Sequence, residues 1–131
     1  MAATKQVLTP AHTPKALGPY SVAVLAGDFL FASGQLGIDP ESSKLVSGGI
    51  EAETRQVLTN VKNTLAGAGL DLSNVVKTTV FLRDMADFAQ MNGIYAEFFT
   101  SEFPARSTVQ VAALPLGAAL EIEVIALANQ A

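Results

Sequence analysis

The chain has 131 residues, of which 50% are hydrophobic and 15% charged. This length fits a single domain over residues 1–131, and the composition excludes a disordered chain because it supplies enough apolar surface for a core. Lysine and arginine number 8 against 12 acidic residues, giving a net charge of -4. No block of like charges occurs, which argues against a nucleic-acid-binding or membrane-surface protein.

Two further compositional features narrow the class of protein. The chain has no cysteine, which excludes disulfides, thiolate metal sites and a cysteine nucleophile. No apolar run approaches the ~20 residues of a membrane span, and residues 1–6 lack an apolar signal core. We therefore expect a cytoplasmic protein, with a mitochondrial location as the alternative.

The first strands are short. Residues 6–8 are a strand candidate, and the apolar runs 21–26 and 29–34 flank a Gly27-Asp28 pair, which predicts a β-hairpin. Ser33 and Gly34 end the second run. A glycine there lets a ligand approach the backbone closely, but a β-bulge explains it equally well, so both interpretations stay open.

The middle of the chain predicts a loop, a helix and a strand. Residues 39–44 and 47–49 are rich in turn-forming residues. From residue 50 to 68, apolar or small residues recur with the spacing of an amphipathic helix, and Gly67 and Gly69 provide its stop. Residues 75–82 are rich in β-branched side chains and predict a strand.

A second helix is predicted over residues 85–100. Phe88, Asn92, Tyr95 and Phe99 then share one face. A buried amide on an apolar stripe needs hydrogen-bond partners. Asn92 therefore either binds a nearby loop or contacts a ligand.

Arg106 places one cation at the start of an apolar strand pattern. Its neighbours are small or apolar, so we expect a partly desolvated guanidinium that pairs with a carboxylate or phosphate. That anion is either internal or a ligand. Residues 119–128 predict a final strand whose second face carries Glu121 and Glu123 beside isoleucine and leucine.

The order of elements predicts an α+β sandwich in which two helices cover one face of a mixed or antiparallel β-sheet. Apolar residues also occur on the second sheet face, for example Phe29 and Phe31 in one strand and Val109 and Val111 in another. We expect that face to pack against another subunit of a homo-oligomer.

The common catalytic motifs are missing from the sequence. His12, the only histidine, lies between two prolines in a predicted solvated loop, which excludes a Ser/His/Asp site. Metal-ligand spacings and glycine-rich phosphate loops do not occur either. What remains is Arg106, a carboxylate and a few hydroxyl and amide groups. Such a set can bind a small carboxylic acid and activate one water.

Seven segments together resemble the RidA (YjgF) family, and the resemblance covers nearly the whole chain. The segments are residues 18–21 (Gly-Pro-Tyr-Ser), 31–35 (Phe-Ala-Ser-Gly-Gln), 60–63 (Asn-Val-Lys-Asn), 76–82 (Val-Lys-Thr-Thr-Val-Phe-Leu), 104–107 (Pro-Ala-Arg-Ser), 111–115 (Val-Ala-Ala-Leu-Pro) and 121–123 (Glu-Ile-Glu). The resemblance implies a chorismate-mutase-like homotrimer with clefts between subunits. It also implies cofactor-independent hydrolysis of 2-iminobutanoate and 2-iminopropanoate to 2-oxo acids and ammonia.

The resemblance also implies roles for particular residues. Arg106 would bind the substrate carboxylate, and Glu121 would orient or deprotonate the attacking water, with Glu123 as the alternative carboxylate. Thr108, which shares the strand face of Arg106, stands where many members have cysteine, so thiol chemistry is not required here. The remaining cleft residues would be Tyr20, Ser33, Gly34 and Asn92.

Two other classes of function compete with the deaminase. Some members of the family are described as ribonucleases that inhibit translation, but the acidic balance and the missing basic stripe oppose RNA binding. A non-enzymatic protein that binds a carboxylate metabolite, or acts as a chaperone, is the second alternative. Ammonia release separates that class from a deaminase.

Overall fold

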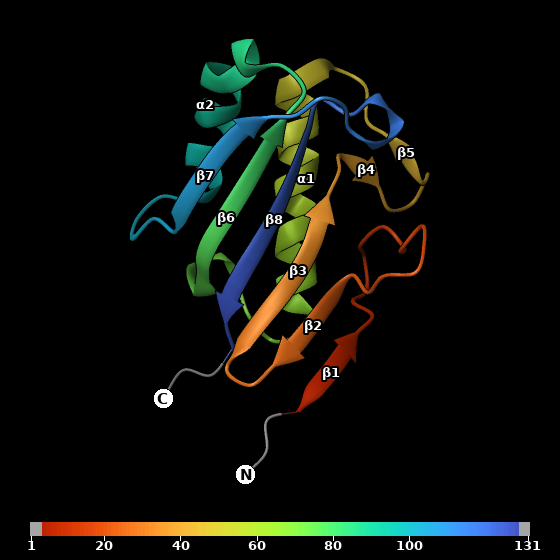
Figure 1. The fold of residues 1–131 in the computed structure, drawn as a ribbon, viewed down its shortest axis with the longest axis vertical. Coiled ribbons are helices and arrows are strands. Elements are labelled where there is room, and N and C mark those ends of the chain that lie inside the picture. The colour runs from red at the N-terminus through yellow and green to blue at the C-terminus, as the bar shows by residue number, and fades with distance from the viewer. Residues whose placement is uncertain (1–3, 129–131) are drawn as a thin grey trace.

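The structure is a computed structural model that describes residues 4–128. Two helices, α1 (Gly49–Ala66) and α2 (Phe88–Phe98), lie on one face of a six-stranded sheet (Figure 1). Its strands, in spatial order, are β1 (Lys5–Leu8), β2 (Ala23–Ala26), β3 (Phe29–Gln35), β8 (Leu120–Leu127), β6 (Val75–Leu82) and β7 (Ala105–Gln110). Only β6 and β7 pair in parallel. The predicted α+β fold with a mixed sheet is confirmed.

The structure corrects two predicted elements. Residues 39–44 are not all loop, because β4 (Ile38–Asp39) and β5 (Lys44–Leu45) pair as a small second sheet. Two-residue strands are too short to show an alternating pattern. The second helix begins three residues later than predicted, after a 3₁₀ turn over Met85–Asp87 whose Ala86 amide donates to Asp84.

The core lies between the sheet and the helices. On β8, Leu120, Ile122, Val124 and Ala126 are at most 2% exposed, as the predicted alternation requires. They belong to one cluster with apolar side chains of α1, of which Val57, Leu58, Val61 and Leu65 are almost completely buried. Burying such side chains stabilises the fold by roughly 1.5–3 kcal/mol each.

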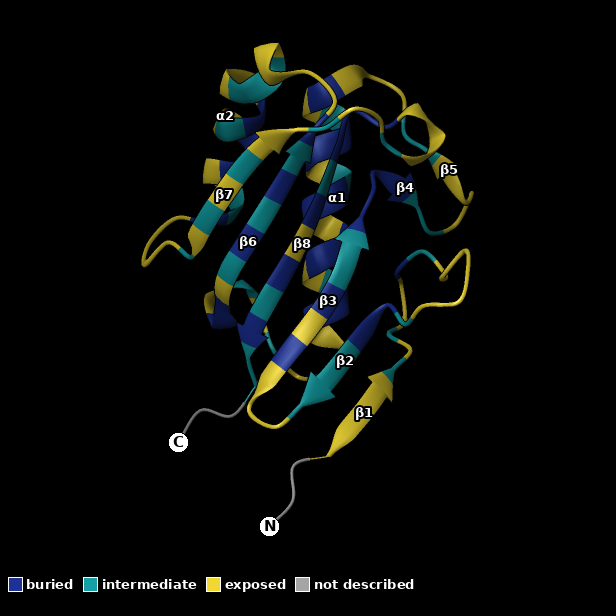
Figure 2. Cartoon of the chain, in the orientation of Figure 1, coloured by how far each residue is buried: buried dark blue, intermediate teal, exposed yellow. Residues whose placement is uncertain are grey.

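The opposite sheet face is left uncovered in the single chain. The strand register places Val7, Val24, Phe31 and Ile125 in one row across four strands on this face. Val7 and Phe31 are 53% and 46% exposed, and Figure 2 shows exposed stretches along β1 and β3. An apolar sheet face of this kind is typical of an interface. No helix of residues 4–128 is long and apolar enough to cross a bilayer.

Candidate functional site

Arg106 lies on the edge strand β7 and faces the helices. Its register partner on β6 is Thr78, which is fully buried on the helix side of the sheet. The Arg106 Cζ atom lies 4.7 Å from the centre of the Tyr95 ring and 5.6 Å from that of Phe88. The expected environment, a half-buried cation among apolar groups, is therefore confirmed.

No internal anion pairs with Arg106. The only salt bridge within residues 4–128 joins Arg55 and Glu97 on the surface of the two helices. Of the two alternatives left open by the sequence, the internal carboxylate is therefore wrong for the single chain. Within the described residues, the guanidinium donors of Arg106 are therefore not used by a carboxylate.

A cavity of about 420 Å³ opens beside this arginine. Its lining is Asn92, Tyr95, Ala96, Phe103, Pro104 and Arg106. Among the described residues the Asn92 amide has no hydrogen-bond partner, so the predicted bond to a loop is not formed. Thr108 lies two residues along the same strand face, and its hydroxyl oxygen is buried without a partner in residues 4–128. The sequence pattern did not single out Tyr95 or Phe103 for the site.

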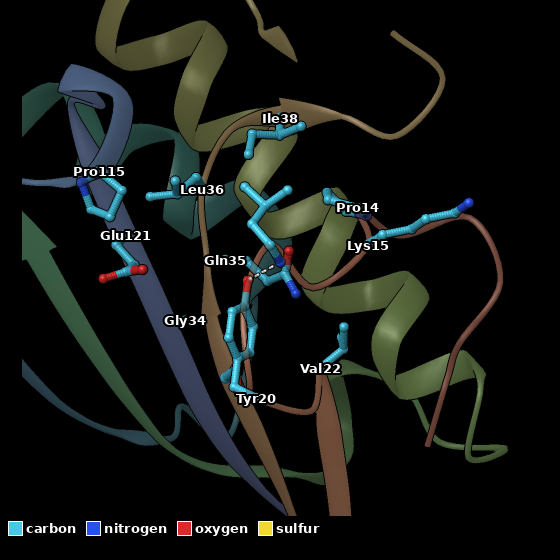
Figure 3. A pocket seen from close by; sticks show the side chains of 12 residues that line it. Pro14, Lys15, Tyr20, Val22, Gly34, Gln35, Leu36, Ile38, Pro115 and Glu121 are labelled. Atoms are coloured by element: carbon cyan, nitrogen blue, oxygen red, sulfur yellow. Dashed lines mark hydrogen bonds between the residues drawn. The ribbon is translucent and has the colours of Figure 1, made fainter. Parts of the chain in front are cut away.

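A second cavity, of about 370 Å³, gathers the other predicted site residues, Tyr20, Ser33, Gly34 and Glu121 (Figure 3). Apolar side chains form much of its wall, and the Lys15 ammonium points away from Glu121. The further lining residues, which sequence analysis missed, are Pro14, Lys15, Leu17, Val22, Gln35, Leu36, Ile38 and Pro115.

The bulge interpretation of Ser33 and Gly34 is confirmed. The register of β3 against β8 shifts between Ala32 and Gln35, so the two residues form a bulge. They also line the second cavity. The Ser33 hydroxyl donates to the Ser21 carbonyl at 2.6 Å, which fixes it at the cavity wall.

Glu121 packs directly over Gly34. A Cβ atom added at Gly34 would lie 2.7 Å from the Glu121 Cδ atom, so only glycine leaves room for the carboxyl group. Burial raises the pKa of the Glu121 carboxyl, and the neighbouring charge of Glu123 raises it further. Glu123 itself is exposed, so Glu121 is the carboxylate better placed for chemistry in a cavity.

Buried polar side chains of α1 hold the rim of this second cavity. The Asn60 amide donates to the carbonyls of Leu36 and Ile38 at 3.1 and 2.9 Å. A Glu53 carboxylate oxygen accepts from the Ala119 amide at 2.9 Å, just before β8 begins. These bonds tie the end of β3 and the start of β8, the two segments that carry Gly34 and Glu121, to one helix.

The two cavities share no lining residue, and Arg106 of one and Glu121 of the other face different sides of the sheet. Arg106 is in register with Thr78 on the helix face. Glu121 alternates with the buried Leu120 and Ile122, so it faces the uncovered side. Within one chain the predicted site is therefore divided into an arginine half and a carboxyl half.

For the imino-acid hydrolysis that the sequence resemblance implies, Gly34→Ala is expected to lower kcat at least about tenfold. The reason is that the new methyl group displaces the Glu121 carboxyl. Stability should change little, since the displaced atoms end a flexible side chain. Steady-state kinetics and thermal unfolding check both statements. Gly93→Ala is the matched control, because its Cβ meets no atom within 4 Å; equal kcat in the two variants would contradict the expected displacement.

The fold and these two half-sites define a small α+β protein with a half-buried arginine in one cavity and a carboxyl group of raised pKa in another. A family profile described as Endoribonuclease L-PSP matches residues 10–128, and the chain belongs to this family, also known as YjgF/RidA. The resemblance noted from the sequence is thereby confirmed. Residues 4–128 contain no cluster of three or more His, Asp or Glu side chains suited to a metal ion.

Three relatives illustrate the similarity. The chain is 50% identical over 123 residues to the 2-iminobutanoate/2-iminopropanoate deaminase of Homo sapiens, covering 94% of this chain and 90% of that protein. It superposes with a TM-score of 0.92, at 47% identity and coverage of 95% and 99%, on a Yersinia pestis structure described as a Rid family protein of unknown function. It also superposes with a TM-score of 0.89, at 38% identity and coverage of 93% and 98%, on E. coli TdcF with bound serine.

Proposed function

We propose that this protein hydrolyses small 2-imino acids to 2-oxo acids and ammonia. The observation that carries the proposal is Arg106, a half-buried cation that lacks a carboxylate partner within residues 4–128. The relative named a 2-iminobutanoate/2-iminopropanoate deaminase supports this substrate class. So does the structure with bound serine, since serine carries a carboxylate next to a nitrogen-bearing carbon.

Substrate binding begins at Arg106. The in-plane N–H donors of a guanidinium match the two oxygens of a carboxylate, which fixes the orientation of the imino acid as well as its position. Asn92, on the wall of the same cavity, offers an amide that has no other partner in the described chain. The buried hydroxyl of Thr108 supplies a further polar group on this face.

Glu121 activates the water. Water adds to the carbon of the protonated imine while one of its protons passes to the carboxylate, which gives a carbinolamine. The carboxyl group returns this proton to the nitrogen, and the C–N bond breaks as the remaining hydroxyl proton passes back to the carboxylate, which releases ammonia and leaves the carbonyl. A carboxyl group whose pKa is raised is the better base for this transfer. Tyr20, Ser33 and Gly34 confine the reacting atoms on the same side.

A complete site requires two chains. Arg106 and Glu121 occupy opposite sheet faces of one chain, so they meet only if the uncovered face of one subunit packs beside the arginine edge of another. The exposed apolar row on that face supports such packing. We take the assembly to be a closed homotrimer with one site at each of its three interfaces.

The test is ammonia release from an imino acid made in the assay. Threonine dehydratase generates 2-iminobutanoate from threonine, and the protein should accelerate its conversion to 2-oxobutanoate and ammonia over the spontaneous rate. Acceleration proportional to protein concentration supports hydrolysis. Saturable binding of 2-oxobutanoate without acceleration would replace the deaminase with a non-enzymatic carboxylate-binding protein.

Activity should fall as the pH is lowered through the raised pKa of Glu121. The Glu121 carboxyl acts as a base only when it is ionised, so activity is kept above its pKa and lost below it. Because this pKa is raised, the loss occurs at a pH above the ~4.3 of an ordinary glutamate. The profile of kcat/KM against pH measures this limb. Glu123→Gln should move the limb to lower pH because it removes a neighbouring negative charge, whereas Glu121→Gln should abolish it.

RNA cleavage is the second candidate, because the family profile is described as an endoribonuclease. The net charge of -4 opposes binding of a phosphate backbone, and a second cationic group is not found beside Arg106 in its cavity. Protein purified free of nuclease should therefore leave RNA intact. Cleavage that persists in pure wild-type protein and is lost with Arg106→Ala would establish the ribonuclease instead.

A further inference from the structure

Tyr95 contacts both Arg106 and Thr78, the residue that pairs with Arg106 in the sheet. Tyr95 is on α2 and Arg106 is on β7, and the centre of the Tyr95 ring lies 4.7 Å from the guanidinium carbon. The Tyr95 hydroxyl bonds to the Thr78 hydroxyl at 2.9 Å. Thr78 is in turn the register partner of Arg106 on β6. The same ring is therefore tied to the strand beside the arginine and lies against the arginine itself.

The ring is held rigidly. Tyr95 is 6% exposed and Thr78 is fully buried, and the Tyr95 ring also packs on Phe99 with ring centres 4.7 Å apart. Burial raises the pKa of the Tyr95 phenol, against smaller opposing effects of the Thr78 hydrogen bond, the Arg106 charge and, least, hydrogen bonding by Arg106. The hydroxyl therefore keeps its proton at neutral pH and its bond to Thr78 persists.

A ring and a carboxylate use different parts of a guanidinium. An aromatic ring attracts the flat face of the cation, whereas the five N–H donors lie in its plane and point outward from its edges. An internal aspartate or glutamate would hold the arginine equally firmly, but it would occupy the donors that a substrate needs. Stacking immobilises the cation and leaves those donors open.

We propose that Tyr95 is a positioning residue for this reaction: its ring, anchored by Thr78, holds the Arg106 guanidinium by the face and presents its edge to the substrate carboxylate. This inference rests on the proposed function, because it needs Arg106 to bind that carboxylate. Phe88, 5.6 Å from the same carbon, gives the guanidinium a second and more distant aromatic neighbour.

The test compares Tyr95→Met with Tyr95→Phe. Methionine fills the core but has no ring face, so it should raise the Kd for 2-oxobutanoate and the KM for 2-iminobutanoate about tenfold, with a smaller change in kcat. Phenylalanine keeps the face and should hold both constants within about threefold of wild type, although it loses the bond to Thr78. Phe99→Leu is the matched control, since it removes a ring that packs on Tyr95 rather than on Arg106.

Two outcomes would overturn the inference. Wild-type Kd and KM in folded Tyr95→Met would show that the ring does not position Arg106, and an equal rise in Tyr95→Phe would move the effect from the ring to the hydroxyl. If Tyr95→Met does not fold, the wild-type protein provides the test by NMR. The δ-methylene protons of Arg106 should resonate upfield because of the ring current, and ordinary shifts would contradict the stacking.

The same experiment separates this inference from the proposed function. Activity retained by Arg106→Ala would remove the carboxylate-binding role of Arg106, whatever the Tyr95 variants did. An inactive Arg106→Ala together with a wild-type KM in Tyr95→Met would leave the proposed function intact and remove only the role of Tyr95.

Discussion

Arg106→Ala is expected to abolish hydrolysis of 2-iminobutanoate while the oligomer persists. Two charge-assisted hydrogen bonds to the substrate carboxylate are lost together, which should lower kcat/KM by about 10³-fold. The fold should survive because Arg106 is half-buried on an edge strand and makes no salt bridge within residues 4–128. Ammonia release measures the loss, and size-exclusion chromatography measures the assembly.

Arg55→Ala is the matched control for that variant. Arg55 is also an arginine, but it lies on the surface of α1 and forms a bidentate pair with Glu97 of α2 at 2.8 and 3.0 Å. Both side chains are 52% exposed, so solvent screens the pair and it contributes little to stability. Full activity is expected from Arg55→Ala. Wild-type turnover in Arg106→Ala would refute the proposed site.

Mixing two impaired variants is expected to restore activity. Arg106→Ala keeps an intact Glu121, and Glu121→Gln keeps an intact Arg106, so a site built from one chain of each is complete. If each site draws its arginine from one chain and its carboxyl from the next, an equal mixture of chains regains about one quarter of the wild-type sites. The mixture is prepared by unfolding and refolding the two proteins together.

The control for this experiment is the same two proteins refolded separately and then combined, which should stay at the low activity of the separate variants while their subunits do not exchange. Failure of the refolded mixture to recover activity, with the proposed trimer formed, would place Arg106 and Glu121 of one chain in the same site. That result would contradict the division of the site by the sheet.

The elements with the strongest patterns were predicted well. The strand over residues 75–82 has the predicted limits, and the two faces of β8 are as expected, because alternation over eight residues is a strong signal. The limits of α2 and the strands β4 and β5 were wrong. A 3₁₀ turn capped by Asp84 has no apolar period of its own, and a two-residue strand has none at all.

The site was predicted in part. Sequence reasoning found the charged members, Arg106 and Glu121, because a charge among apolar residues requires an explanation wherever it is placed. It did not find the role proposed here for Tyr95, which looked like an ordinary member of an apolar stripe. That role depends on a contact with Arg106, which lies 11 positions further along the chain on a strand, so no local spacing indicates it.

The sequence alone determined which chemical groups this protein can use: one arginine in need of an anion, a carboxylate on a half-apolar strand, and no thiol. Tertiary structure decided how these groups are arranged. It placed Arg106 on the helix face and Glu121 on the open face, and it left the arginine without an internal partner. The physical reason is that a residue's own charge and polarity are local properties, whereas its partners are set by strand register and by which sheet face the helices cover.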